Sequence, residues 1–337
     1  KMKINKNTNN FNLTLYTPLI SLKGLFAVDQ KRFHTCNYIH EFNPWFVTGL
    51  TDAKGCFYIS ITKNYKFKTG WKVLAFFELK LHKRDLELLN YIQVQLGGVG
   101  RIMPNGEEAY SFRVNVLNEL LDVIIPHFNK YPLITQKLAD YLLWKEIVNK
   151  MKNKEHLTYE GTLEIVSIRA SINTGLSKVL NNEFSNVIPI SRPLVENKEI
   201  PHEGWLAGFI SGEGSLFVRV NKSRTNIWSR VQLEFILTQH TRDKNLLESF
   251  IKYLGCGTVR YYNNRDTCSF ICTKYNDIYN IIIPFIKKYP ILGVKSQDFN
   301  DWCKVVEEMK LGNHLTLEGL KRILKIKANM NRGRKLD

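Results

Sequence analysis

Several stretches of the chain alternate between hydrophobic and polar residues, and others carry apolar residues at helical spacing. Residues 56–62 place Phe57, Ile59 and Ile61 on one side of an extended chain and more polar residues on the other. This alternation predicts a half-buried β-strand. Asn43, which precedes a proline, predicts the N-cap of a short apolar helix just before that strand.

The elements predicted after this strand recur in the second part of the chain. In the first part we expect strands at 72–81, 99–102 and 110–114, with helices at 84–96 and from 118 onward; in the second part, strands at 215–220, 230–238, 258–262 and 269–273, with helices at 245–254 and from 278 onward. Each part therefore has the order αββαββα, which predicts an α+β fold.

Short sequence matches at a constant spacing show that the chain contains a long internal repeat. Lys-Tyr-Pro at 130–132 returns at 288–290, and the segment 156–161 returns as 314–319, in both cases 158 residues later. The segment at 47–50 returns at 206–209, which is 159 residues later and requires one single-residue insertion or deletion. We conclude that two copies of one domain are present.

The repeat sets the predicted domain organisation. We expect a first domain over 41–177, a linker over 178–201 and a second domain over 202–337. The linker contains several prolines and asparagines and shows little periodicity, which predicts an extended segment. Residues 1–40 precede the first copy, and we treat them as an N-terminal arm.

Composition adds a strong charge bias to this picture. Hydrophobic residues make up 44% of the 337 residues, enough for packed cores, while 48 Lys and Arg against 31 Asp and Glu give a net charge of +17. Such an excess favours a polyanionic partner, most simply nucleic acid. A membrane partner is disfavoured, because apolar runs such as 281–283 end well short of the ~18 residues that a membrane span needs.

Residues 47–55 and 206–214 carry the most informative pattern. Gly49 in the first segment, and Gly208 with Gly212 in the second, would allow two helices to approach backbone to backbone; a packing motif without chemistry would have the same spacing. Glu213 follows an apolar helix and stands between two glycines, so it does not serve a core. It is either an exposed turn carboxylate or an oxygen ligand for Mg²⁺.

These two segments resemble the two motifs of monomeric LAGLIDADG homing endonucleases, and the resemblance extends over about residues 44–335. It is greatest to the two-motif enzymes encoded in fungal mitochondrial introns. The resemblance implies two pseudo-symmetric domains with curved antiparallel sheets that form a DNA-binding saddle. It further implies site-specific hydrolysis of DNA phosphodiesters with Mg²⁺ held by motif carboxylates and backbone oxygens.

Carried over residue by residue, the resemblance assigns Glu213 and Gly212 to the metal site. It places Lys137 and Lys295, which occupy equivalent positions of the repeat, at the family's active-site lysines, although either could be an ordinary surface lysine at a helix N-terminus. Gln239 matches a polar position that helps to order water in the family, and Leu81 replaces it in the first copy.

The first motif departs from the family at its acidic position, which holds Lys54. An ammonium group has no lone pair with which to coordinate Mg²⁺. We expect Lys54 to form an ion pair with Glu213 across the helix pair, and Asp52, two residues earlier, to point away from the axis. These features predict DNA binding with impaired cleavage, or cleavage of one strand only.

The strand faces opposite the predicted core carry residues suited to nucleic acid, with Arg, Gln, Asn and Ser for base edges and Lys for phosphates. The predicted contacts are Ser60, Thr62, Lys63, Lys66, Lys68, Arg101, Arg113, Arg219, Asn221, Lys222, Arg224, Arg230, Gln232, Arg260 and Arg265. By the family resemblance, two such surfaces side by side span a DNA site of about 20 base pairs.

Three functions therefore remain open. The first is a monomeric, Mg²⁺-dependent DNA endonuclease, the second an RNA-binding maturase for its own group I intron, and the third a ribosome-associated protein on the same scaffold. The abundance of Asn, Lys, Ile and Tyr suits an A+T-rich genome, and together with the resemblance it predicts a mitochondrial location.

Overall fold

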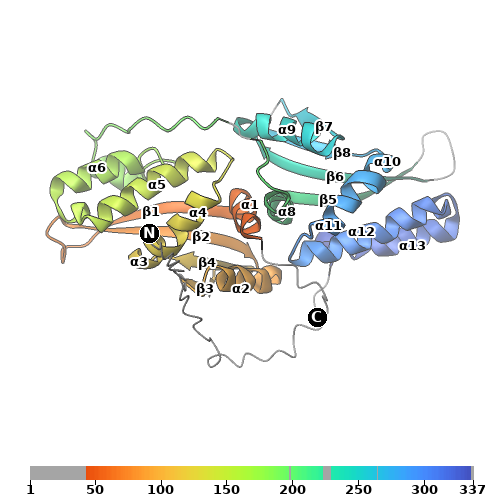
Figure 1. Ribbon diagram of the computed structural model, residues 1–337, viewed down its shortest axis with the longest axis horizontal. Helices are drawn as coiled ribbons and strands as arrows, with labels where there is room; N and C mark the ends of the chain where they lie inside the picture. Colours follow the sequence, from red (N-terminus) through yellow and green to blue (C-terminus); the bar gives the residue numbers. More distant parts are fainter. Residues whose placement is uncertain (1–42, 197–198, 223–228, 264, 335–337) are drawn as a thin grey trace, which may run out of the picture. The chain divides into compact units, whose positions relative to one another are not determined.

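The structure is a computed structural model that describes residues 43–196, 199–222, 229–263 and 265–334, with the side chains of Lys222 and Ser229 left out. The predicted arm at 1–40 and the predicted contact Arg224 lie outside the described residues. The described residues belong to one compact unit, in which two similar halves follow one another along the chain (Figure 1).

The first half opens with helix α1 (Pro44–Lys54), and it begins where the sequence predicts. The side chain of Asn43 accepts a hydrogen bond from the backbone N–H of Trp45 at 3.0 Å, and Pro44 takes the first helical position. Helix α8 (Glu203–Glu213) opens the second half in the same way, with the ring Nδ1 of His202 accepting from the backbone N–H of Gly204 at 2.8 Å.

Each half contains one four-stranded antiparallel sheet, in the orders β1-β2-β4-β3 and β5-β6-β8-β7. The predicted strands are all present, and two of them start two residues away from the prediction. The turn at 97–100 contains three glycines at positive φ, so β3 begins at Arg101 rather than at residue 99, and β8 begins at Thr267 rather than at residue 269. The strands are β1 (Gly55–Lys63), β2 (Trp71–His82), β3 (Arg101–Pro104), β4 (Ala109–Val114), β5 (Gly214–Lys222), β6 (Ser229–His240), β7 (Thr258–Tyr261) and β8 (Thr267–Cys272).

The helical parts are more divided than the predicted αββαββα order. Pro132 and Pro290 stop the helix before them, and Thr158 and Thr316 cap a further helix in each half, so the single helix predicted at the end of each half becomes a series. The helices are α2 (Leu86–Gln95), α3 (Leu117–Glu119), α4 (Ile125–Lys130), α5 (Lys137–Lys152), α6 (Tyr159–Arg169), α9 (Lys244–Leu254), α10 (Tyr275–Asp277), α11 (Ile283–Lys288), α12 (Val294–Lys310) and α13 (Leu317–Ala328).

Each half has its own hydrophobic core between its sheet and its helices. In the first half Phe57 of β1 contacts the rings of Phe77 and Trp144, with centroids 5.2 Å apart in both cases. In the second half Phe270 packs against Phe235 and Phe250. The cores use the inward face of each sheet, so the outward faces remain for other contacts.

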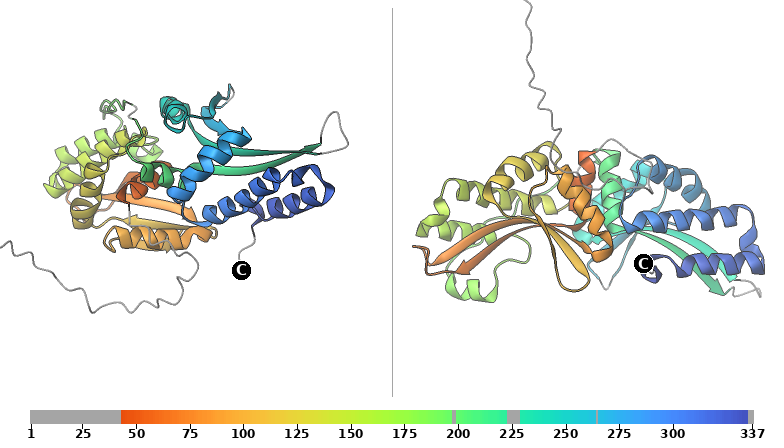
Figure 2. Two further views of the ribbon diagram at one scale, coloured as in Figure 1. Left: turned by 45° about the vertical axis from the view of Figure 1, so that its right-hand side comes forward. Right: turned by 90° about the horizontal axis from the view of Figure 1, so that it is seen from below.

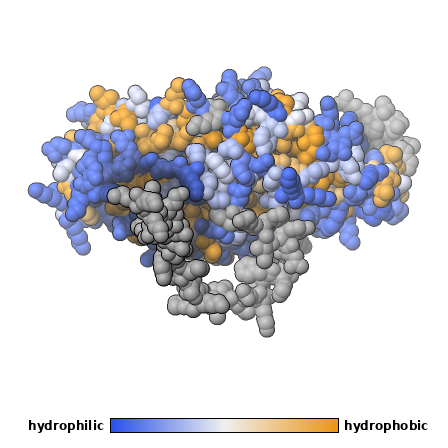
Figure 3. Space-filling model, in the orientation of Figure 1, coloured by the Kyte–Doolittle hydropathy of each residue, from blue (hydrophilic) through white to orange (hydrophobic). Residues whose placement is uncertain are grey.

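Hydrophilic residues cover most of the face in Figure 3, and the hydrophobic residues visible there are scattered. Within the described ranges, no helix is long and apolar enough to cross a membrane.

The segment at 178–201 is not wholly extended, in contrast to the prediction. It begins with the short helix α7 (Lys178–Glu183), because the Ser177 side chain accepts a hydrogen bond from the backbone N–H of Leu180. Phe184 packs against Trp71 with ring centroids 5.0 Å apart. Further on, Arg192 forms a bidentate ion pair with the buried Asp140, at 2.6 and 2.9 Å. This segment is therefore fastened to the first half rather than loose.

Helices α1 and α8 lie side by side between the two sheets, in backbone contact (Figure 2). A methyl group added at Gly49 would lie 1.9 Å from the carbonyl oxygen of Trp205, and one added at Gly208 would lie 2.1 Å from that of Phe46. Only glycine permits this approach. The helix pair predicted from these glycines is confirmed.

Replacing Gly208 with Ala should separate the helices and destabilise the fold by about 3 kcal/mol or more, because the added methyl group would collide with backbone. Thermal and urea unfolding would measure the loss. The control is Gly70→Ala, where a methyl group meets nothing within 4 Å and only the positive φ of 77° costs about 1 kcal/mol. Equal losses in the two variants would contradict the close packing of α1 and α8.

Burial lowers the pKa of His127 to about 4, and its Nε2 lies 3.2 Å from the hydroxyl of Thr48 on α1. The unfolded chain binds a proton at this histidine near pH 6.5, whereas the folded chain binds it only near pH 4. The protein should therefore lose up to about 3 kcal/mol of stability as the pH falls through this window. His127→Gln should flatten that part of the stability curve, and an unchanged curve would contradict the assignment.

Candidate active site at the helix seam and candidate nucleic-acid interface

The C-terminal ends of α1 and α8 meet at a point that we call the seam, formed by Lys54 and by Gly212 with Glu213. The Nζ of Lys54 lies 2.9 Å from Oε1 of Glu213, with the side chains 36% and 20% exposed. The predicted ion pair across the helices is confirmed. A methyl group at Gly212 would lie 3.2 Å from Cγ of Lys54, so the lysine stem runs close along the opposite helix.

Two further lysines reach the seam from equivalent positions of the repeat. Lys137, the first residue of α5, donates to the carbonyl oxygens of Thr51 at 2.8 Å and Asp52 at 3.0 Å. Lys295, on α12, donates to those of Ile210 and Gly212, both at 3.0 Å. The ammonium groups thus donate to carbonyls of the last helical turns, at the negative ends of the two helix dipoles. Neither lysine is an ordinary surface residue.

Burial perturbs both of these lysines. It lowers the pKa of Lys137, although the nearby Asp52 acts in the opposite direction. It lowers the pKa of Lys295 to about 8, with the neighbouring charge of Lys54 acting in the same direction. At pH 7 the Lys295 ammonium remains mostly protonated.

The seam residues do not fit a divalent metal ion in this arrangement. Mg²⁺ requires oxygen ligands in octahedral geometry, but the Glu213 carboxylate is paired with Lys54 and the Gly212 carbonyl accepts from Lys295. Within the part of the chain that the structure describes, no group of three or more His, Cys, Asp or Glu side chains could hold a metal. In this arrangement the oxygen atoms at the seam are partners of lysine ammonium groups and are not open as metal ligands.

Asp52 is buried close to the seam, and its carboxylate does not replace the missing acid. Its oxygens accept from the hydroxyl of Thr135 at 2.6 Å, the backbone N–H of Ile134 at 3.1 Å and the indole N–H of Trp205 at 2.8 Å. Trp205 belongs to α8, so this network joins the two halves. Burial raises the pKa of Asp52 while these donors oppose the shift; because every one of these partners donates, the geometry suits the ionised carboxylate.

Gln239 and Leu81 occupy matching places, as the sequence predicts. Gly214 pairs with Leu237 at the start of β5, and Gln239 lies two residues further along β6 on the same face. In the first half Gly55 pairs with Leu79, and Leu81 lies two residues further along β2. The second half therefore carries an amide where the first carries an aliphatic side chain.

Two aspartates that our sequence analysis did not single out fasten the halves to each other. Asp243 accepts a hydrogen bond from the backbone N–H of Gln136, just before α5, at 2.8 Å. Asp85 accepts one from the backbone N–H of Val294, the first residue of α12, at 2.7 Å. Each half thus caps a helix of the other. The available signal was that both aspartates follow an arginine at the repeat spacing of 158 residues.

The outward face of the first sheet carries a mixed aromatic and polar surface. Tyr58 and Phe76 stack with ring centroids 4.8 Å apart, and Arg113 forms a 2.9 Å ion pair with Glu78. Of the predicted contacts, Ser60, Thr62, Arg101 and Arg113 share this face, and Lys66 and Lys68 are exposed in the β1–β2 turn.

Lys63 lies on the other side of this sheet. It continues the inward series that contains Ile59 and Ile61, and its ammonium pairs with Glu183 of α7 at 2.6 Å. The structure therefore separates Lys63 from the other predicted contacts of the first half.

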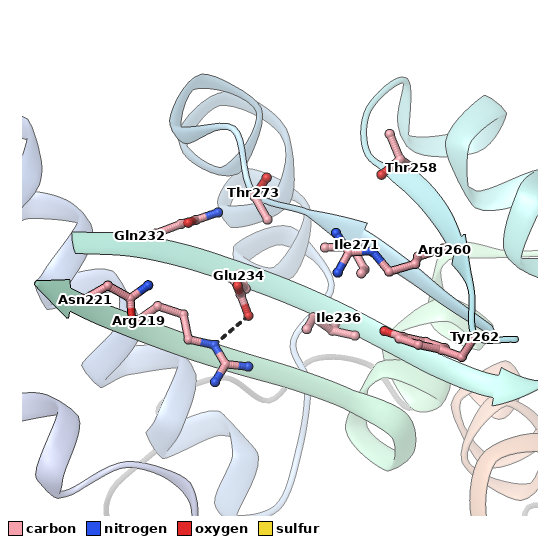
Figure 4. A pocket seen from close by; sticks show the side chains of 10 residues that line it. All are labelled: Arg219, Asn221, Gln232, Glu234, Ile236, Thr258, Arg260, Tyr262, Ile271 and Thr273. Carbon is pink, nitrogen blue, oxygen red and sulfur yellow. Dashed lines mark hydrogen bonds and ion pairs between the residues drawn. The ribbon is translucent and has the colours of Figure 1, made fainter. Parts of the chain in front are cut away.

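The outward face of the second sheet is hollowed by a cavity of about 460 Å³ (Figure 4). Gln232, Asn221 and Arg260 line it together with Ile236 and Tyr262. The remaining lining residues are Arg219, Glu234, Thr258, Ile271 and Thr273, with an ion pair of 2.9 Å between Arg219 and Glu234. Arg230 and Arg265 are exposed.

Comparison with known proteins identifies the fold and its motifs. Residues 47–148 and 206–306 each match the LAGLIDADG endonuclease family. The chain belongs to this family. Its first match begins within α1 and its second within α8, so each includes a seam helix and the sheet that follows.

Among curated LAGLIDADG relatives, the chain is 38% identical over 298 residues to "Probable intron-encoded endonuclease 3" of Neurospora crassa, covering 87% of this chain and 55% of the relative. It is 40% identical over 325 residues to "Probable intron-encoded endonuclease 2" of the same fungus, covering 93% and 71%. The chain thus spans about half of the first relative's length.

Solved LAGLIDADG structures agree with this fold. The I-SmaMI homing endonuclease bound to cleaved DNA has 44% sequence identity and a TM-score of 0.86, covering 88% of this chain and 99% of that one. I-GzeII in complex with its DNA target has 44% identity and a TM-score of 0.81, covering 87% and 100%. The predicted fold class of two antiparallel sheets in repeated domains is confirmed.

Asp52→Asn should destabilise this LAGLIDADG chain by about 2–3 kcal/mol, because an amide carries one acceptor oxygen where the carboxylate offers two to several buried donors. Urea unfolding followed by tryptophan fluorescence would measure the loss. Asp122→Asn, at an exposed position, is the control and should change stability by no more than about 0.5 kcal/mol. A loss that small in both variants would contradict the network.

Proposed function

We propose that this LAGLIDADG chain binds a specific double-stranded DNA sequence of about 20 base pairs along the outward faces of its two sheets. The observation that carries the proposal is the pair of repeated sheets whose outward faces hold arginine, glutamine and asparagine, in a chain of net charge +17. The two DNA-bound relatives, at 44% identity, support it.

Side chains of the two halves would contact different parts of the DNA. Gln232, Asn221 and Arg260 line the hollow of the second sheet and have the donor and acceptor groups that read base edges in a major groove. Lys66 and Lys68, in the exposed turn of the first half, suit phosphates. Affinity should fall steeply with salt, with a slope in log K of about 0.9 per neutralised phosphate.

We further propose that cleavage is impaired, or limited to one strand. The family's chemistry depends on divalent ions, and a related I-SmaMI structure holds an uncleaved target in the presence of calcium ions. Among the residues that the structure describes, Glu213 is the one carboxylate paired across the seam, and Lys54 neutralises it. A Mg²⁺-dependent hydrolysis would first require that this ion pair open.

The chain needs no second copy for this role, because α1 and α8 already form the pseudo-twofold contact within one polypeptide. We therefore propose a monomer. Relatives named as intron-encoded endonucleases, together with the "Uncharacterized mitochondrial protein RF1" of Saccharomyces cerevisiae, support a mitochondrial location.

A second candidate function is the RNA-binding maturase of a group I intron, or a ribosome-associated protein on the same scaffold. Lys54 favours these alternatives, because a non-cleaving role would tolerate the loss of a motif acid. Specific retention of the host intron RNA in a filter-binding assay would support the maturase. Faster splicing of that intron in the presence of the protein would support it further. Co-sedimentation with ribosomal particles would support the scaffold role.

Lys54→Glu should raise double-strand cleavage of the target by at least tenfold in Mg²⁺, because it supplies the second carboxylate at the seam. The measurement is the conversion of a supercoiled plasmid carrying the target to nicked and linear forms. Lys54→Met is the matched control, since it removes the ion pair without adding an acid, and it should not cut both strands. Efficient cutting of both strands by the unaltered chain would refute the impairment.

A further inference from the structure

Positive side chains outnumber negative ones at the seam, whereas a site built from two acids would carry a net negative charge. Three lysines, Lys54, Lys137 and Lys295, surround the single carboxylate of Glu213. With all four of these side chains charged they sum to +2, and the buried carboxylate of Asp52 beside Lys137 reduces the sum to +1 when it is ionised. A backbone phosphate that approached two bare carboxylates would be repelled, whereas a phosphate approaching this cluster is attracted.

Lys54 is the member of the cluster that can meet a ligand. Its ammonium has three N–H donors, and the bond to Glu213 uses one of them. The side chain is 36% exposed, while Lys137 and Lys295 direct their ammonium groups to helix carbonyls. The stem of Lys54 lies against Gly212, which holds the charged end at the midline between the halves.

The packing of the two helices fixes the position of the Lys54 ammonium. Lys54 is the last residue of α1, and α1 is pressed against α8 at Gly49 and Gly208. The two sheets begin immediately afterwards, at Gly55 and Gly214. A duplex lying along both sheets would therefore cross the seam midway, where its backbone would pass the exposed ammonium.

We propose that Lys54 is a built-in cation that holds a DNA backbone phosphate at the seam, so that this chain binds duplex DNA without a divalent metal. This inference rests on the proposed DNA-binding function and adds a site to it. Lys54 supplies the positive charge at the midline, and Glu213 fixes its position.

The test begins with selection of bound sequences from a randomised DNA duplex library, once in EDTA and once in Ca²⁺. The affinity of the purified full chain for the selected duplex is then measured by fluorescence anisotropy in both buffers. The unaltered chain should bind with affinities within twofold of each other. Lys54→Met should bind about threefold to tenfold more weakly in EDTA, with a salt slope lower by about 0.9.

Lys54→Glu should bind more than tenfold more weakly than the unaltered chain in EDTA and recover in Ca²⁺, because two carboxylates then need a metal to screen them. Lys325→Met is the matched control. Lys325 is an exposed lysine of α13, which packs on α12 rather than on the outward sheet face. It should leave binding within twofold. Thermal melting would verify that every variant folds.

The outcomes separate this inference from the function on which it rests. Enrichment of a duplex in Ca²⁺ alone, or equal affinities for the unaltered chain and Lys54→Met in EDTA, would overturn the built-in cation and leave DNA binding intact. Failure to enrich any duplex in either buffer would overturn the proposed DNA-binding function itself.

Discussion

The backbone contact between α1 and α8 is the constraint on which the rest of the structure depends. Gly49 and Gly208 remove the side chains that would otherwise hold the helices apart. Because β1 starts at Gly55 and β5 at Gly214, with no intervening residue, the helix pair sets where both sheets begin. The same contact brings Lys54 within hydrogen-bond distance of Glu213, so fold and candidate site share one cause.

The two halves have kept the residues that hold their backbones and have diverged elsewhere. Asp140 and Asp298 each accept from the backbone N–H of an asparagine, Asn173 or Asn331, and these asparagines have φ of 52° and 55°. Their partners differ: Arg192 of the segment after the first half reaches Asp140, whereas Arg334 reaches Asp298. Both halves therefore have an aspartate that accepts from the backbone of an asparagine, but the arginine that pairs with this aspartate comes from a different segment in each half.

Local pattern was sufficient for most of the fold. Alternation located the strands, and Asn43 with Pro44 located the start of α1. The same alternation, continued from Ile59 and Ile61, places Lys63 on the inward face of β1. The prediction instead grouped Lys63 with the lysines of the turn that follows. The helix α7 was missed although Ser177 supplies a local N-cap, and the contact of Phe184, the residue after α7, with Trp71 joins distant segments that local pattern does not encode.

Contacts between the halves were harder to predict for the same reason. Asp85 and Asp243 cap helices more than 100 residues away, and no local spacing encodes such a pairing. The Lys54–Glu213 pair could be predicted because the repeat aligned the two positions and the glycines indicated a close helix pair. The carbonyl partners of Lys137 and Lys295 required the three-dimensional structure.

Stability alone does not account for a lysine at position 54. An ion pair with side chains 36% and 20% exposed contributes at most about 1 kcal/mol, and salt screens it further. The fold rests instead on the glycine contact and on the buried network of Asp52, neither of which involves the Lys54 side chain. Many side chains would therefore be compatible with folding at this position. What distinguishes lysine there is its charge at an exposed position between the two halves, which is the property that the proposed phosphate contact uses.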